Sequence, residues 1–417
     1  MQKTNYRWVV ASFSMFLAFV SYMDRVNLSV ATPMIMQEFG FTKIEMGWLQ
    51  TAFFLAYAGF QIPGGMLAEY FGSRVITTVA VTWWSIFTVL TGLCSSFNSF
   101  LMTRFAFGVG EAPVFPALSA ANQRWFPTVE RSKASAMMSA GAYIGPIFGP
   151  AIVVAIMMAW GWRAVFYIFG FAGIAIAIAY YYFVANYPKD SKFVNKAELD
   201  YINEGEKATT EKKEVAPWGI FLKSSQFWAI AGQFFATDYV LYVFLAWLPV
   251  YLMEARGFSL QQMGFAAALP YLAVTLGVLG TGVISDKLLK SGVTKNKVRT
   301  SFGIIGLFVC CLALIAATYT EDKWTTVMWL TLANGALGPV FAVSWAATID
   351  LGGKFTGTVS GWMNFWGNMG GVAAPISAAW IATNYGWGAV LIATSAMAIV
   401  GAVFWVMVKP DRQLRTS

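Results

Sequence analysis

The sequence predicts an all-α membrane protein with twelve transmembrane helices in two six-helix bundles. Only 12% of its 417 residues are charged, whereas a soluble domain carries about 25%. Apolar segments also recur along the whole chain, and each is long enough to cross a bilayer, which takes roughly 20 residues. The predicted spans comprise residues 8–36, 45–68, 75–94, 99–122, 134–158, 162–184, 225–253, 260–285, 300–319, 323–349, 355–382 and 385–408.

The two halves of the chain repeat each other, which supports a division into six plus six spans. Three pairs of stretches match in the same order and at a nearly constant offset: 40–48 with 257–265, 65–69 with 282–286, and 161–165 with 386–390. Such a parallel repeat is typical of secondary transporters, whose substrate site lies near the membrane midplane between two bundles. We therefore expect an N-terminal bundle (1–184), a cytoplasmic linker (185–223) and a C-terminal bundle (224–417).

The distribution of Lys and Arg predicts the orientation. Of 28 such residues, 22 fall on the side that holds both termini, four fall on the other side, and Arg25 and Arg104 lie inside spans. Cytoplasmic loops carry the excess of positive charge, so both termini are predicted to be cytoplasmic. Within the linker, residues 195–207 are predicted to form either an amphipathic surface helix or a solvated connection.

Composition excludes several classes of function. The chain has no His, and its three Cys residues show no metal-ligand spacing, so we expect no metal and no cofactor. It has no phosphate-binding loop of the G-x-x-x-x-G-K-[ST] type, which argues against ATP-driven transport. Without His, a His-based nucleophile or a zinc site is excluded, so we do not expect an enzyme. We assign the net charge of +8 to the cytoplasmic loops, with the bilayer and not a nucleic acid as partner.

An adjacent acid and base interrupt the first span. Asp24 and Arg25 are costly near a bilayer centre unless they are paired or face water. Ser21, Arg25, Ser29 and Thr32 recur at helical spacing and form one polar stripe. The stripe is either a structural contact between helices or a binding and coupling site.

The fourth span carries a second acid and base, Arg104 and Glu111. They are seven residues apart on one helix, so they share a face about 10 Å apart. Because burial raises the pKa of a carboxyl group and a nearby Arg lowers it, Glu111 is a candidate proton carrier, as is Asp24. An Arg without a counterion predicts an anionic ligand. Asp238, in the seventh span, is a third intramembrane acid whose role the sequence does not specify.

Uncharged polar side chains line two further spans. Gln50, Phe54, Tyr57 and Gln61 share one face of span 2, and Ser360, Asn364 and Asn368 share one face of span 11. Amides and phenols suit the uncharged groups of a small ligand, although contacts between helices are an equal alternative for each residue. On the cytoplasmic side, Glu69 and Arg74, with Asp286 at the repeated position, are predicted to be gating residues.

The motifs together resemble a known family. They are Tyr22-Met-Asp24-Arg25-Val-Asn27-Leu-Ser29, Gln61-Ile-Pro63-Gly64-Gly65, Gly110-Glu111-Ala112-Pro113, Trp125-Phe126-Pro127 and Asn364-Phe-Trp-Gly-Asn368. This set resembles the anion:cation symporters of the major facilitator superfamily, which include bacterial sugar-acid carriers and the sialic-acid and vesicular glutamate transporters. The resemblance covers essentially the whole chain and implies the major facilitator fold, with transport by alternating access.

The resemblance also implies roles for individual residues. Asp24 and Glu111 correspond to the family's protonation pair, and Arg104 corresponds to its span-4 arginine. The residues that correspond to its substrate-binding positions are Arg25, Tyr22, Tyr57, Arg104, Asn364 and Asn368. The expected function is proton-coupled symport of a small organic anion, such as a hexuronate or an aldonate, by a monomer in a bacterial inner membrane.

Two departures from the family pattern keep alternatives open. Residue 69 is Glu where Asp is usual, which preserves the charge. The stretch 141–145 lacks the glutamine of many sugar-acid carriers, so an aromatic or other carboxylate remains an alternative substrate. Sodium coupling, with Asp24, Asn27 and Glu111 as oxygen ligands, and exchange transport on the same scaffold are further alternatives.

Overall fold

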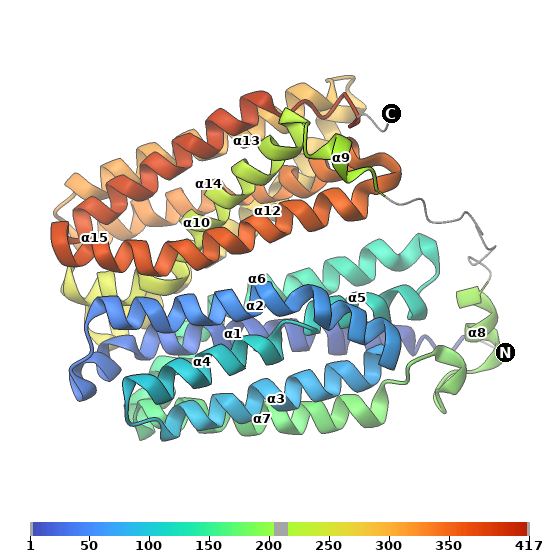
Figure 1. Ribbon diagram of the computed structural model, residues 1–417, viewed down its shortest axis with the longest axis horizontal. Coiled ribbons are helices and arrows are strands. Elements are labelled where there is room, and N and C mark those ends of the chain that lie inside the picture. Colours follow the sequence, from blue (N-terminus) through green and yellow to red (C-terminus); the bar gives the residue numbers. More distant parts are fainter. Residues whose placement is uncertain (1–2, 204–215, 415–417) are drawn as a thin grey trace. The chain divides into compact units, whose positions relative to one another are not determined.

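The computed structural model describes residues 3–203 and 216–414, which are helical almost throughout (Figure 1). The chain forms two compact units. Unit 1 comprises residues 1–35 and 52–213, and unit 2 comprises residues 36–51 and 214–417. Residues 36–51, which contain the end of the first helix and the start of the second, thus group with the second half of the chain. The boundaries that we predicted from the sequence at residues 184 and 224 stay a prediction.

Unit 1 contains the first six predicted spans, apart from residues 36–51. Its helices are α1 (Arg7–Phe39), α2 (Lys43–Phe71), α3 (Ser73–Leu93), α4 (Phe97–Glu111), α5 (Val114–Trp125), α6 (Thr128–Trp160) and α7 (Trp162–Phe183), followed by the short η1 (Pro188–Asp190) and α8 (Lys196–Asn203). The fourth span is the pair α4 and α5, which are interrupted at Ala112 and Pro113. The break follows directly after Glu111, so that residue ends a helix.

Unit 2 contains the other six spans. Its helices are α9 (Trp218–Phe221), α10 (Ser225–Glu254), α11 (Leu260–Ala266), α12 (Ala268–Lys290), α13 (Lys295–Tyr319), α14 (Lys323–Gly352), η2 (Gly353–Phe355) and α15 (Thr356–Met407). The last helix contains two predicted spans, because Gly386 interrupts it with a φ of 81°, a conformation that glycine adopts readily. The described residues therefore confirm the twelve-helix architecture.

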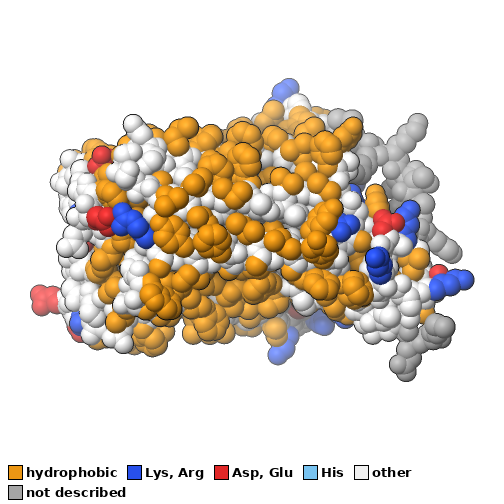
Figure 2. Space-filling view, turned by 90° about the horizontal axis from the view of Figure 1, so that it is seen from below, with side chains coloured by type: hydrophobic (Ala, Val, Ile, Leu, Met, Phe, Trp, Pro, Cys, Tyr) orange, Lys and Arg blue, Asp and Glu red, His pale blue; other side chains and the backbone are white. Residues whose placement is uncertain are grey.

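The surface suits a bilayer. Large apolar side chains point outward along the helices, such as Phe171 and Leu279, which are 62% and 64% exposed. Hydrophobic side chains cover the middle of the face in Figure 2, and charged side chains gather toward its ends. By length and hydropathy, eight stretches of the described residues qualify as membrane spans, and the last of them, 323–407, contains three of the predicted ones. In water such a surface would be an aggregation hazard.

Close helix contacts in unit 1 depend on glycine. A Cβ at Gly141 on α6 would overlap the carbonyl oxygen of Met15 on α1, and one at Gly145 would lie 2.7 Å from the carbonyl oxygen of Phe19. Glycine permits this approach of two membrane helices. These two glycines frame the stretch that lacks the expected glutamine, and they hold α6 directly against the part of α1 that leads to Asp24 and Arg25.

The described part of the linker is attached to the start of the chain. Glu198 on α8 is fully buried and accepts hydrogen bonds from the backbone N–H groups of Tyr6 and Arg7 at 2.9 and 3.1 Å. The Arg7 guanidinium contacts Glu198 at 3.0 Å and Glu130 on α6 at 2.7 Å. Residues 196–203 thus form a docked helix rather than a solvated chain. Asn195 precedes this helix, and residues 204–207 of the predicted helix lie outside the described residues.

Loss of the Glu198 charge is expected to release this docked helix. Burial alone would raise the pKa of Glu198, but hydrogen bonds from Thr4, Tyr6 and Arg7 outweigh it and lower the pKa. The charged form of Glu198 therefore stabilises the docked helix fully above about pH 4.3, the usual pKa of Glu. This stabilisation is lost as the pH falls through the lower pKa of the folded state. Glu198→Gln should remove about 1.5–3 kcal/mol of docking energy. Amide exchange in residues 196–203 should rise at least tenfold at pH 7, and unchanged exchange would contradict this. Asp200→Asn, an exposed acid on the same helix, is the control.

Candidate functional site

The polar stripe of α1 meets the end of α4 inside unit 1. Ser21 and Arg25 lie one turn apart on α1, and both donate to Oε1 of Glu111. The Arg25 Nε–Glu111 Oε1 distance is 2.8 Å, and the two side chains are 2% and 0% exposed. Two donors at i and i+4 reach one acceptor because these positions share a face of the helix. Ser21 and Arg25 thus lie on one stripe, as the spacing predicts.

Aromatic rings surround the Arg25 guanidinium. Its central carbon lies 4.6 Å from the ring centre of Tyr22, 4.5 Å from that of Tyr57 and 5.3 Å from that of Phe53. A guanidinium that is held over aromatic faces is stabilised by cation–π attraction. Three of the predicted substrate-binding residues, Arg25, Tyr22 and Tyr57, are therefore neighbours in unit 1.

Phe53 was missed by the sequence reading. Its ring lies near both intramembrane arginines, at 5.3 Å from Arg25 and 5.4 Å from Arg104. Its spacing from Tyr57 could have identified it from the sequence, since positions i and i+4 share a face of a helix. We had instead placed Gln50, Phe54, Tyr57 and Gln61 together. Of these, Gln50 belongs to unit 2, where its side-chain amide donates to the carbonyl oxygen of Ala246 at 3.2 Å.

Asp24 is fully buried but does not pair with the adjacent Arg25. Successive residues on a helix point about 100° apart, and Asp24 Oδ1 accepts a hydrogen bond from Asn27 Nδ2 at 2.9 Å. Asp24 Oδ2 has no hydrogen-bond partner among the described residues. The buried acid therefore retains an oxygen that can take up a proton. The sodium alternative, which uses the same residues, stays a prediction.

Arg104 is the buried cation of unit 1 without an ion pair among the described residues. It is 3% exposed, its Nε has no hydrogen-bond partner there, and its guanidinium carbon lies 4.4 Å from the ring centre of Phe107. The sequence places Arg104 on the same face of this helix as Glu111, about 10 Å away. The arginine that contacts Glu111 is Arg25, because the seven-residue spacing leaves Arg104 about two turns away.

The predicted ligands of the second half lie on α15 in unit 2. Asn368 is 4% exposed, and its side-chain amide donates to the carbonyl oxygen of Asn364 at 2.9 Å. Ser360 donates to Oγ1 of Thr348 at 3.0 Å. The stripe at positions 360, 364 and 368 therefore carries uncharged hydrogen-bonding groups, as predicted, and its members also make contacts within their own unit.

The predicted gating residues differ from one another in their contacts. Arg74 donates from Nε to the carbonyl oxygen of Tyr181 at 2.7 Å, and its backbone N–H donates to Asn186 at 2.8 Å, so it is attached to the end of α7. Glu69 and Asp286 are exposed. Their gating roles stay predictions.

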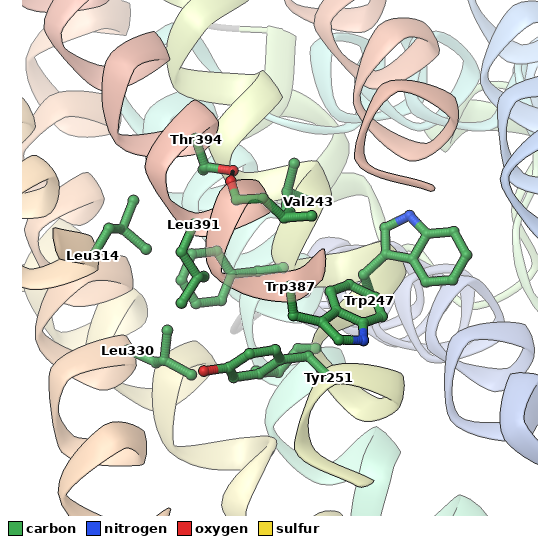
Figure 3. Close-up of a pocket in the computed structure, with 11 residues that line it drawn as sticks. Val243, Trp247, Tyr251, Leu314, Leu330, Trp387, Leu391 and Thr394 are labelled. Atoms are coloured by element: carbon green, nitrogen blue, oxygen red, sulfur yellow. Dashed lines mark hydrogen bonds between the residues drawn. The ribbon is translucent and has the colours of Figure 1, made fainter. Parts of the chain in front are cut away.

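Unit 2 also contains an apolar pocket between α10, α13, α14 and α15. The rings of Trp247, Tyr251 and Trp387 lie on one side of it, and Leu314 and Leu330 on the other (Figure 3). Its lining contains no charged residue. The pocket therefore lacks the groups that would bind an anion or carry a proton, and we assign it no part in the site.

Comparisons with known proteins agree with this architecture. Residues 14–375 match the model of the Major Facilitator Superfamily. The chain is 32% identical to a probable sulfoacetate transporter of Cupriavidus necator, over 90% of this chain and 87% of that one. It is 31% identical to a D-galactonate transporter of Escherichia coli, with coverage of 94% and 93%. It is 30% identical to a probable galactarate/D-glucarate transporter of Bacillus subtilis, with coverage of 97% and 92%.

The fold is also found among solved structures. The crystal structure of a bacterial homologue of the human lysosomal transporter Spinster, in an inward-facing and unoccupied conformation, matches with a TM-score of 0.82 over 96% of both chains. Its sequence identity of 19% supports the fold alone. The family match covers most of the chain and the relatives cover nearly all of it, so this protein belongs to the Major Facilitator Superfamily and is a membrane transporter, not an enzyme.

Proposed function

We propose that this transporter imports a small organic anion together with protons, and that a sugar acid such as a hexuronate or an aldonate is the substrate. The observation that carries the proposal is the buried pair of Arg25 and Glu111, 2.8 Å apart. An ion pair in the membrane interior contributes little net stability after desolvation. Intramembrane charges of this kind usually belong to an ion or substrate pathway.

The pair suggests how proton and anion binding are linked. Arg25 stays protonated and can bind a carboxylate by two parallel hydrogen bonds, but Glu111 already occupies its Nε. When Glu111 takes up a proton, its charge disappears and the carboxylate of a substrate replaces it at Arg25. Each ligand therefore favours the binding of the other, as reciprocal coupling requires.

The balance of charge in unit 1 supports the same scheme. Among its described residues, the buried intramembrane charges are two cations, Arg25 and Arg104, and two acids, Asp24 and Glu111, which cancel. An anion that binds alone would leave a net buried charge, which is costly. An anion with one proton preserves neutrality. A second proton, on Asp24, would let an inside-negative potential add to the driving force, at the cost of one net buried charge.

The names of the relatives support an organic anion as substrate. Sulfoacetate, galactonate, galactarate and glucarate share a small size and at least one acidic group, and those relatives are named for them. Asn364 and Asn368 in unit 2 would bind the uncharged groups of the substrate. The bacterial relatives also support a bacterial inner membrane, where we expect a monomer with both termini in the cytoplasm.

Substrate binding tests the proposal directly. Purified protein in detergent should be stabilised by one class of acid among glucuronate, galactonate, an aromatic carboxylate and sulfoacetate. A ligand at one hundred times its Kd adds about 2.7 kcal/mol to the free energy of unfolding, which a thermal-shift titration detects. Neutral sugars of the same size serve as controls. Stabilisation by the neutral sugars, with none by any acid, would contradict the proposal.

A further inference from the structure

Trp84 is a buried indole of unit 1 that the proposed coupling mechanism does not use. It lies in the middle of α3 and is fully buried, and its Nε1 has no hydrogen-bond partner among the described residues. An indole N–H can only donate a hydrogen bond, and it usually finds an acceptor when it is buried. A buried donor without an acceptor is costly, so its neighbours bear on what it does.

The acceptor within reach of this indole is the Asp24 carboxylate on α1. Asp24 Oδ1 accepts a hydrogen bond from Asn27 Nδ2 at 2.9 Å, whereas Oδ2 has no partner among the described residues. An unpaired donor and an unpaired acceptor thus lie beside each other in the interior of unit 1. A small rotation of either side chain aligns them in a hydrogen bond.

Glycines on two neighbouring helices allow α3 to lie this close. A Cβ at Gly110 of α4 would lie 3.0 Å from the backbone nitrogen of Trp84. A Cβ at Gly173 of α7 would overlap Oγ of Ser85 and would lie 3.8 Å from Trp84 Nε1. Glycine permits such an approach of membrane helices. Because Gly110 directly precedes Glu111, Trp84 packs against the turn of α4 that carries the other proton carrier.

The charged groups that act most on Asp24 both come from α4. Glu111 opposes a negative charge on Asp24, and Arg104 favours one. The hydrogen-bond donors that face the carboxylate are uncharged: the Asn27 amide on α1 and the Trp84 indole on α3. The indole is therefore placed to act on the charge of Asp24 without adding a charge of its own.

We propose that Trp84 is a positioning residue for proton release, whose indole N–H binds Asp24 Oδ2 once Asp24 has lost its proton. The inference rests on the proposed function, because it takes Asp24 as the second proton carrier. A charged carboxylate forms stronger hydrogen bonds than a neutral carboxyl group, so the indole stabilises Asp24 in its charged form. Since Asn27 already donates to Oδ1, Trp84 supplies the donor for the second oxygen.

The test follows the protonation of Asp24 in the purified full-length protein. The infrared carbonyl stretch of protonated carboxyl groups is recorded against pH, and the Asp24 signal is the one absent from Asp24→Asn. Trp84→Phe keeps an aromatic ring but loses the N–H. Asp24 should then hold its proton up to a pH about one unit higher, a tenfold gain in proton affinity.

Trp83→Phe is the matched control. Trp83 is the neighbouring indole on α3, and its Nε1 donates to the carbonyl oxygen of Ala106 at 2.8 Å. The variant therefore loses one indole hydrogen bond of the same helix that does not involve Asp24. The midpoint of its Asp24 titration should equal that of the unsubstituted protein.

A second measurement gives the answer if Trp84→Phe does not fold. In the unsubstituted protein, one indole N–H resonance should shift over the pH range in which the Asp24 signal titrates. This shift should be absent in Asp24→Asn. Indole resonances that are all insensitive to Asp24 would overturn the inference.

The infrared titration can contradict the inference in two ways that leave the proposed function intact. One is an unchanged midpoint in Trp84→Phe, and the other is an equal shift in Trp83→Phe. An Asp24 signal that does not titrate at all rejects Asp24 as a proton carrier and this inference with it. Coupling through Glu111 is judged separately, by proton uptake.

Discussion

Uphill uptake should disappear when Glu111 is replaced by Gln. Gln cannot carry a proton, and its uncharged amide does not compete for the Arg25 guanidinium that Glu111 holds at 2.8 Å. A gradient of one pH unit supports about tenfold accumulation of an anion that is coupled to one proton. The variant should therefore only equilibrate its substrate, while exchange of labelled for unlabelled substrate persists.

Three further observations make this prediction specific. Substrate binding should be tighter at lower pH in the unsubstituted protein and should depend less on pH in Glu111→Gln, because proton binding and anion binding are then uncoupled. Glu321→Gln, an exposed acid between α13 and α14, should accumulate substrate normally. Normal gradient-driven accumulation by Glu111→Gln would remove Glu111 from the coupling mechanism.

Replacement of Arg25 by Ala should abolish substrate binding. The substitution removes the buried guanidinium that lies between Glu111 and the rings of Tyr22 and Tyr57. It also leaves Glu111 as a buried charge without this partner, a change that destabilises proteins by about 3–5 kcal/mol. A thermal-shift titration should show both a lower melting temperature and no response to the substrate.

The double variant Arg25→Ala with Glu111→Gln separates these two effects. It removes both charges of the pair, so most of the lost stability should return while substrate binding stays absent. Arg25→Lys should bind weakly, because an ammonium group does not form the planar bidentate contact of a guanidinium. Retained affinity in the stable double variant would show that another residue binds the carboxylate, with Arg104 the first to examine.

The helices were largely predictable because membrane spans leave a strong signal. Length and apolar composition locate each span, and the break at Gly386, with a φ of 81°, falls within a few residues of the predicted boundary between the last two. The shared face of Ser21 and Arg25 was equally predictable, because it depends only on the helical repeat.

Contacts between helices were harder to predict. The partner of Glu111 depends on the rotation and depth of α1 against α4, which periodicity does not specify, and the structure selects Arg25 rather than Arg104. The packing of Asp238 against Gly367 likewise needs the relation of α10 to α15. The docking of Glu198 on Arg7 joins residues far apart in the sequence, where no local pattern applies.

The most direct test of proton-coupled anion import uses proteoliposomes that contain a pH-sensitive dye. Galactonate, glucuronate or an aromatic carboxylate is added outside without an imposed pH gradient, and the internal pH is followed. We expect internal acidification with one class of acid. It should be absent in Glu111→Gln, although that variant still exchanges the substrate. Uptake of labelled substrate without acidification, driven by sodium or by exchange alone, would contradict it.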